Sequence, residues 1–240
     1  MSDNSKGLIV LSGASSGIGL AMTKTLLLEG YSVIGLDKSF ENVEIKDKNF
    51  KPIVLDLSDL DELPDSLTEI LARINQPIRA LVNNAGLGRM AFVEQLSIAD
   101  MKMVMEVNFL SHAIITKCFL PTLKQQKNLV DIVFTASEAS MRGARQGSVY
   151  CASKFAIRGF AQALREECAK SSVRVSVLNP GAVRTAFFNE LHFEPGSDPE
   201  NAIEPEDVAE VILTILDARP GTVIDEINLS PQKQVWKKKN

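Results

Sequence analysis

The chain has 240 residues, of which 45% are hydrophobic and 23% are charged, so it is long enough to bury one core and predicts a single domain over residues 1–240. Its formal net charge of −4 argues against nucleic acid as a partner, and its three cysteines and two histidines lack the spacing of a metal site. Because the N-terminus has no secretory pattern and no apolar run approaches the roughly 18 residues of a membrane helix, we expect a cytoplasmic protein with no membrane partner.

Short aliphatic runs alternate with longer amphipathic stretches along the chain. The predicted strands are residues 7–12, 32–36, 52–55, 79–83, 129–136, 173–178 and 223–229. The predicted helices are residues 18–29, 60–74, 98–123, 149–169 and 205–216, whereas the charged segment 38–51 favours a loop. This alternation is typical of parallel strands joined by crossover helices. We therefore predict an α/β fold, a Rossmann-type doubly wound parallel sheet in one domain with helices on both faces.

Two segments near the C-terminus fall outside this alternation. Bulky apolar residues followed by proline, glycine and aspartate predict a mobile substrate lid at residues 187–204, although an ordinary surface loop explains the composition equally well. Residues 233–240 include Lys237–Lys239, and terminal lysines are mostly solvated. We therefore expect a flexible tail there.

A glycine-rich turn connects the first predicted strand to the first predicted helix. Its residues are Gly13, Ala14, Ser15, Ser16, Gly17, Ile18 and Gly19. Backbone N–H groups in such a turn approach a pyrophosphate without side-chain clashes, and the helix N-terminus adds positive charge. The order of strand, turn and helix favours a dinucleotide-binding loop over a purely structural turn.

Acidic residues follow the second and third predicted strands. Asp37 lies 18 residues after Gly19 (37 − 19), where a carboxylate can bind both ribose hydroxyls of an adenosine and repel a 2′-phosphate. This favours NAD, while the adjacent Lys38 leaves NADP open. Asp56 and Leu57 are candidates for the adenine edge, but helix capping explains Asp56 equally well.

Four further motifs follow in chain order. They are Asn83-Asn84-Ala85-Gly86 at the end of the fourth strand, Asn108 in a long helix, Ser137 after the fifth strand, and Tyr150-Cys151-Ala152-Ser153-Lys154 at the start of the next helix. Together with the glycine loop, they resemble the compact, single-domain type of the short-chain dehydrogenase/reductase family. The resemblance extends from Gly13 to beyond Asn179-Pro180-Gly181. It implies an NAD(P)(H)-dependent oxidoreductase that interconverts a secondary alcohol and a carbonyl by hydride transfer.

The resemblance also implies catalytic roles. Tyr150 and Lys154 are four residues apart and share one helix face, so the ammonium can favour the phenolate of Tyr150, the implied acid/base. Lys154 is further implied to bind the nicotinamide ribose. Ser137 is implied to hold the substrate oxygen, with Ser140 as a competing candidate, and the backbone carbonyl of Asn108 is implied to bind a relay water.

Additional cofactor contacts follow from the resemblance. They are Asn84, Ala85 and Gly86 on the adenosine side, Pro180, Gly181, Val183 and Thr185 after the sixth strand, and Tyr150 and Lys154 themselves. In the second group, the Val183 backbone is implied to meet the nicotinamide carboxamide and the Thr185 hydroxyl to reach the cofactor. A helix-entry turn explains the same stretch.

The substrate is less defined than the reaction. Residues 223–231 resemble relatives that act on small 3-hydroxy acids, and acyl-chain carbonyl reductases and steroid or sugar alcohol dehydrogenases are comparable alternatives. Glu138 either selects a cationic substrate or faces solvent. The fold also permits a protein that senses a dinucleotide, or acts as a scaffold, without turnover.

The resemblance implies a homo-oligomer, a dimer or tetramer built on helices 98–123 and 149–169. Apolar spacing on both helices is compatible with this assembly, but burial against the sheet explains the same residues.

Overall fold

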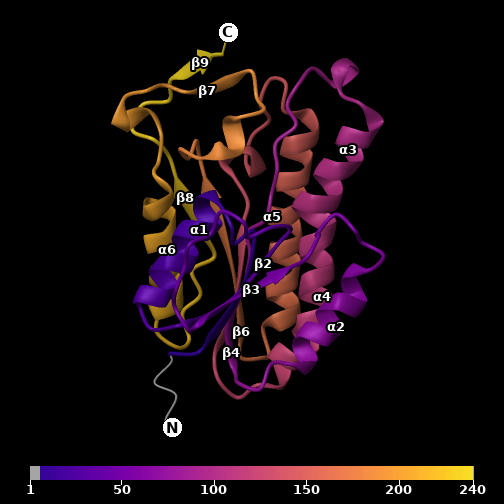
Figure 1. The fold of residues 1–240 in the computed structure, drawn as a ribbon, viewed down its shortest axis with the longest axis vertical. Coiled ribbons are helices and arrows are strands. Elements are labelled where there is room, and N and C mark those ends of the chain that lie inside the picture. The colour runs from indigo at the N-terminus through magenta and orange to yellow at the C-terminus, as the bar shows by residue number, and fades with distance from the viewer. Residues whose placement is uncertain (1–5, 240) are drawn as a thin grey trace.

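The computed structural model describes residues 6–239 and shows a seven-stranded sheet in which every pairing is parallel (Figure 1). The strands are β1 (Leu8–Ser12), β2 (Ser32–Asp37), β3 (Phe50–Val54), β4 (Ile78–Asn83), β5 (Val130–Thr135), β6 (Val173–Pro180) and β8 (Glu226–Leu229). Their order is β3-β2-β1-β4-β5-β6-β8, so the direction of winding reverses between β1 and β4. The predicted fold class is confirmed. In doubly wound sheets, ligands bind at the carboxyl ends of the strands beside such a reversal.

Helices cover both faces of the sheet (Figure 1). They are α1 (Gly17–Leu28), α2 (Leu63–Ala72), α3 (Ile98–Met105), α4 (Ser111–Gln125), α5 (Ser148–Cys168) and α6 (Pro205–Asp217). The apolar faces of α1 and α6 pack on one side, and those of α2, α4 and α5 pack on the other. The segment between β2 and β3 forms no helix, as its charged composition predicts.

The helix predicted at residues 98–123 is interrupted. A π turn at Glu106–Leu110 separates α3 from α4. Contrary to our expectation, the continuous stretch Ile98–Gln125 is long and apolar enough to cross a membrane by length and composition alone. Its residues Ile115, Phe119 and Leu123 are fully buried in the core. A helix of a protein core can meet the same criterion of length and apolar composition.

A buried ion cluster lies at the end of the sheet opposite the carboxyl ends of the strands. Asp131 is fully buried and pairs with Arg79 and with Arg174, whose Nε lies 2.6 Å from Oδ1. Arg174 also donates to the carbonyls of Ile215 and Ala218, at the end of α6. Because the last carbonyls of a helix have no partner within it, these bonds fix α6 to the sheet.

The C-terminal segment differs from the flexible tail that we expected at residues 233–240. Its strand β9 (Trp236–Lys238) pairs antiparallel with β7 (Phe193–Pro195), which lies inside the expected lid (Figure 1). The centroid of the Trp236 ring lies 5.3 Å from that of Phe193 and 5.9 Å from that of Phe188. This aromatic packing offsets the entropy of ordering a terminus. Asn240 lies outside the described residues.

Candidate active site

The glycine loop joins β1 to α1 and packs against the end of β4. Gly13 has a φ of +70°, and a Cβ atom at this position would lie 2.8 Å from the Cα of Ala85. A Cβ atom on Gly19 would collide with the Gly13 carbonyl oxygen. Only glycine fits these two positions, so the loop backbone lies directly against neighbouring backbone.

The N-terminus of α1 has the properties of an anion site. Ser16 occupies the cap position without a side-chain capping hydrogen bond, so its hydroxyl does not satisfy the first N–H groups of the helix. A Cβ atom on Gly17 would lie 3.1 Å from the Cγ2 of Thr185, which places the loop after β6 beside the glycine loop. The donors and the helix dipole fit a pyrophosphate group.

Asn84 ties this loop to the end of β4. Its Nδ2 donates to the carbonyls of Ser12 and Gly13, at 3.2 and 3.3 Å. The Ser12 hydroxyl accepts from the backbone N–H groups of Asn84 and Ala85, at 3.0 and 3.2 Å. Sequence reasoning missed Ser12, whose only signal is its position directly before Gly13.

The two acidic strand ends have different environments. Asp37 Oδ2 accepts from the backbone N–H of Ser15 at 3.0 Å, which places this carboxylate against the glycine loop. Asp56 accepts from both the backbone N–H and the hydroxyl of Ser58, which lower the pKa of its carboxyl group. These bonds form a local turn, since α2 begins only at Leu63. The side chain of Leu57 is buried in the core.

Tyr150 and Lys154 lie on one face of α5 and are both buried. The Lys154 Nζ atom lies 5.8 Å from the centroid of the Tyr150 ring and donates to the Thr135 carbonyl at 3.1 Å. Burial raises the pKa of Tyr150 to about 12, against a hydrogen bond from Ser137 that lowers it. Burial also lowers the pKa of Lys154 to about 8. At pH 7 the lysine is therefore still largely charged beside a neutral phenol.

The structure distinguishes the two candidate serines. Ser137 follows β5, lies close enough to Tyr150 to lower the pKa of its phenol, and accepts from the backbone N–H of Ala139 at 3.2 Å. Ser140 is fully buried and donates to Asn179 Oδ1 at 2.7 Å. Ser137 is thus the serine that lies beside the phenol.

Asn108 lies in the π turn, a local distortion that is frequent at functional sites. Its side chain is fully buried, exchanges two hydrogen bonds with the backbone of Leu87 and donates to the Ser153 hydroxyl at 3.1 Å. A Cβ atom on Gly86 would lie 3.5 Å from both Asn108 Oδ1 and Lys154 Nζ. Asn108 therefore links the loop after β4 to the helix that carries Tyr150 and Lys154.

His112 is a buried polar residue that sequence reasoning did not single out. It follows Asn108 by one helical turn, and its ring is fully buried near the Ala85 backbone. Burial and the charge of Lys154 lower the pKa of His112 to about 3, so the ring is neutral. Its only signal is its spacing from Asn108. Across residues 6–239, no three histidine, cysteine or acidic side chains gather as a metal site.

The expected lid residue Phe187 lies against Tyr150. The two ring centroids are 5.6 Å apart, and a Cβ atom on Gly88 would lie 2.5 Å from Phe187 Cζ. Phe187 therefore covers the phenol from the side of the loop after β4. Whether the segment moves stays a prediction.

The loop after β6 begins at the end of the sheet. Gly181 donates from its backbone to the Leu229 carbonyl at 2.8 Å, directly after Pro180, and Val183 forms a parallel bridge with Ile203. Glu138 accepts from Gln234 at 2.8 Å and pairs with Arg142 at 3.3 Å, and its charge also raises the pKa of Tyr150. This carboxylate holds the C-terminal segment.

Residues 7–195 match the family described as short chain dehydrogenase. The chain belongs to this family of oxidoreductases. It is 32% identical to the NADP-dependent 3-hydroxy acid dehydrogenase of Schizosaccharomyces pombe, over 94% of this chain and 93% of that protein. It is also 29% identical to the dehydrogenase/reductase SDR family member 11 of Bos taurus, over 95% and 97% of the two chains.

Among solved structures, the chain superposes on the alcohol dehydrogenase of the archaeon Thermococcus sibiricus complexed with 5-hydroxy-NADP. The TM-score is 0.82 with 28% identity, over 93% of this chain and 95% of that one. A 3-ketoacyl-(acyl-carrier-protein) reductase of Brucella melitensis, complexed with NADH, shares the fold with a TM-score of 0.83 and 21% identity, over 96% and 99% of the two chains.

Proposed function

We propose that the protein is an NAD(P)(H)-dependent oxidoreductase that interconverts a secondary alcohol and a ketone or other carbonyl. One observation carries the proposal. The buried Tyr150 has the Lys154 ammonium 5.8 Å from its ring centroid, and it is covered by Phe187, from the loop that packs beside the glycine cradle. The buried acid/base group and the pyrophosphate cradle thus lie at one end of the sheet.

The residues present fit a dinucleotide. The glycine loop and the N-terminus of α1 would hold the pyrophosphate, and Asp37 would hold the adenosine ribose. Lys154 would bind the nicotinamide ribose beside Tyr150. When bound, the nicotinamide supplies or accepts the hydride, and the protein contributes orientation and proton transfer.

Tyr150 would move the proton. With a pKa raised to about 12, the phenol is neutral at pH 7 and its Oη carries the proton that a carbonyl oxygen needs during reduction. In the direction of oxidation the phenol must lose this proton, which the charge of Lys154 favours. The Ser137 hydroxyl would donate to the substrate oxygen as negative charge develops on it.

We propose NAD as the preferred cofactor. The Asp37 carboxylate lies against the glycine loop, where it would bind ribose hydroxyls and repel a 2′-phosphate. Named relatives include an NADP-dependent protein, so the preference rests on Asp37 alone. Separate titrations with NADH and NADPH test it, and tighter binding of NADPH would reverse it.

The proposed reaction is tested by following the oxidation of NADH and of NADPH with a panel of ketones, aldehydes and 3-oxo acids. We expect turnover of at least one carbonyl. The alternative, a dinucleotide-sensing or scaffold protein, predicts that the cofactor binds with no turnover across the panel.

We also propose a homo-oligomer formed through α4 and α5. A groove of about 600 Å³ between these helices is lined mainly by apolar side chains, including Leu110, Ile114, Leu120, Phe160 and Ala163. Phe155, on α5, is 45% exposed. Exposed apolar faces of this kind are covered in stable assemblies. Light scattering should give twice or four times the monomer mass, and a monomer would contradict the proposal.

The compartment is also a proposal. Cys118, Cys151 and Cys168 are free thiols, which favours the reducing cytoplasm. Fractionation of the cells that make the protein tests this placement, and recovery outside the cytosolic fraction would contradict it.

A further inference from the structure

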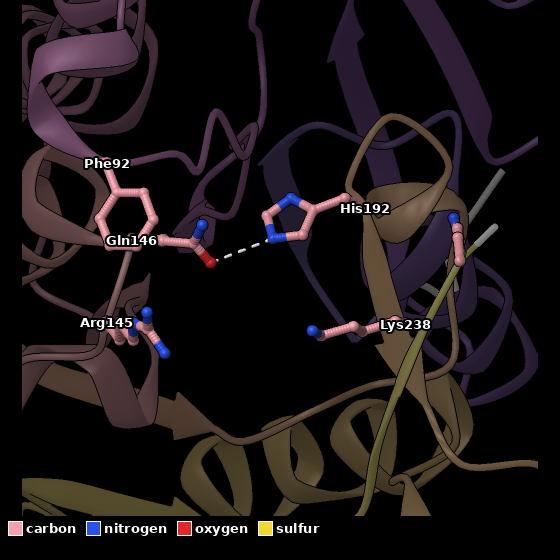
Figure 2. A pocket seen from close by; sticks show the side chains of 6 residues that line it. Phe92, Arg145, Gln146, His192 and Lys238 are labelled. Carbon is pink, nitrogen blue, oxygen red and sulfur yellow. Dashed lines mark hydrogen bonds between the residues drawn. The ribbon is translucent and has the colours of Figure 1, made fainter.

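A second cavity, of about 310 Å³, lies between the lid segment and the loop that leads into α5 (Figure 2). It is lined by Phe92, Arg145, Gln146, His192, Lys238 and Lys239. Figure 2 shows Phe92 and Arg145 on one side and His192 and Lys238 on the other, with the Lys238 ammonium directed toward the Arg145 side. The cavity thus brings together four segments that are distant in sequence.

The charges on the cavity wall are predominantly positive. Within the described residues, Arg145 and Lys238 form no ion pair, and Arg145 lies over the Phe92 ring at 5.1 Å from its centroid. Lys239 is 3.8 Å from Glu194 and donates to the Phe188 carbonyl. Glu190, two residues before His192, pairs with Arg89. The Arg145 guanidinium and the Lys238 ammonium therefore have no carboxylate partner among the described residues.

Tyr150 does not line the cavity, but residues of both cavity walls belong to segments that lead to it. Gln146 lies about one helical turn before Tyr150 in the chain, and its Oε1 is 3.0 Å from His192 Nε2. On the lid side, neighbouring aromatic rings run from His192 through Phe193 and Phe188 to Phe187, which contacts Tyr150. The Gln146–His192 bond thus joins the lid segment to the loop that leads into α5.

The backbone of Gln146 indicates that this bridge is specified by the fold. Among residues 6–239, Gln146 is the one non-glycine residue with a positive φ, at 62°. Such a conformation is unfavourable for a residue with a side chain and is frequent at ligand sites. In Gln146, this backbone conformation occurs together with the side-chain hydrogen bond to His192.

We propose that the cavity binds an anionic group of the substrate, a carboxylate or a phosphate, while the reacting carbon lies at Tyr150. Arg145 supplies a planar donor group and Lys238 a compact charge, which together suit an oxyanion. This inference rests on the proposed oxidoreductase function and adds the substrate class to it: hydroxy or oxo compounds that carry a negative charge.

The kinetic test uses substrate pairs that differ in charge. The first pair is acetoacetate and methyl acetoacetate, and the second is dihydroxyacetone phosphate and dihydroxyacetone, each reduced with NADH and NADPH. We expect the anionic member of at least one pair to have a higher kcat/KM, and the pair that responds distinguishes a carboxylate from a phosphate. Arg145→Gln and Lys238→Gln should each lower that kcat/KM about tenfold, mainly through KM, because each removes a charged hydrogen bond.

Lys237→Gln is the matched control. Lys237 lies beside Lys238 on β9, but its ammonium donates to Ser197 at 2.7 Å and does not line the cavity. We expect this variant to retain the wild-type kcat/KM for both members of each pair within twofold. The neutral members should likewise respond less than twofold to Arg145→Gln and Lys238→Gln.

A binding measurement makes the test independent of turnover. Trp236 is the single tryptophan of the chain and lies two residues from Lys238, so its fluorescence reports on this region. Titration with sodium acetoacetate and with inorganic phosphate, at constant ionic strength, should give a saturable change for at least one anion. The change should be retained in Lys237→Gln and lost in Arg145→Gln.

The outcomes separate this inference from the proposed function. Efficient turnover of the neutral members, with no preference for charge and no saturable fluorescence change, overturns the anion site and leaves the oxidoreductase intact. Saturable binding without turnover of any carbonyl supports the anion site and contradicts the oxidoreductase. Equal losses for charged and neutral substrates in Arg145→Gln would assign that residue a structural role and overturn the proposal.

Discussion

The ammonium of Lys154 lies 5.8 Å from the centroid of the Tyr150 ring, and both side chains are buried on the same face of α5. Burying this charge opposes folding, and burial accordingly lowers the pKa of Lys154 to about 8 from its ordinary 10.5. The lysine therefore reduces the stability of the fold while it supports the proposed chemistry of the tyrosine.

Lys154→Met should change how stability depends on pH. Between pH 8 and 10 the unfolded wild type binds more protons at residue 154 than the folded protein, so the free energy of unfolding should rise with pH, by about 2 kcal/mol. Methionine cannot titrate, so the variant should lack this increment. Above pH 10 the raised pKa of Tyr150 acts in the opposite direction, because the unfolded phenol ionises first. Urea unfolding at pH 8 and pH 10 measures the difference, and an equal rise in both proteins would contradict it.

Ser137 and Ser140 form a matched pair for separating catalysis from stability. Ser137→Ala should lower kcat about 100-fold, because it removes a donor to the substrate oxygen. It should reduce stability by about 0.5–2 kcal/mol, because it also removes the acceptor for the Ala139 N–H. Ser140→Ala should destabilise the fold by about 1–3 kcal/mol, because it removes the bond to the buried Asn179, and should leave kcat largely unchanged. Steady-state kinetics and chemical denaturation on both variants check this, and the reverse pattern would reassign the serines.

Asp37→Asn should shift cofactor selectivity toward NADPH. Loss of the negative charge removes repulsion of a 2′-phosphate, so the ratio of NADPH to NADH affinity should rise about tenfold. Asp56→Asn is the control, since Asp56 is engaged by Ser58, and should leave the ratio within twofold. Equilibrium titration of each variant with both cofactors supplies the ratios. An unchanged ratio in Asp37→Asn would remove the basis of the NAD assignment.

Arg174→Met should be strongly destabilising. It removes one of the two arginines that pair with the buried Asp131, together with the bonds to the end of α6, and an incompletely compensated buried charge costs about 3–5 kcal/mol. Arg73→Gln, at an exposed pair on α2, should change stability by less than about 0.5 kcal/mol. Denaturant midpoints at pH 7 compare the two, and similar small shifts would mean that the cluster contributes little.

The sequence predicted most of the sheet because the central strands are continuous apolar runs. All eight residues of β6 are buried, and the predicted strand at 173–178 lies within it. The glycine loop could be predicted equally well, since Gly13 and Gly19 occupy positions that only glycine fits. β8 was less accurately predicted: it begins at Glu226, three residues after the predicted start, although the Asp225 carbonyl already accepts from Val177 of β6.

Contacts between distant segments were not predictable. The pairing of Phe193 with Lys238 has no local signal, and a lysine-rich terminus has the composition of a solvated tail. The hydrogen bond between Glu138 and Gln234 was equally unpredictable, because the two residues are 96 positions apart in the chain. The π turn at Asn108 was also missed, since apolar spacing continues through it. Sequence periodicity reports which face is buried, not which segment covers it.

The most direct test of the proposed chemistry compares hydride transfer in the wild type and in Tyr150→Phe, which removes only the phenolic oxygen. Both proteins, saturated with the reduced cofactor that binds more tightly, are mixed with the best carbonyl of the panel, and the first turnover is followed by the loss of nicotinamide absorbance. We predict a rate about 100- to 10,000-fold lower in Tyr150→Phe, with cofactor affinity unchanged within threefold. A first-turnover rate within threefold of the wild type would contradict the assignment of Tyr150 as the acid/base.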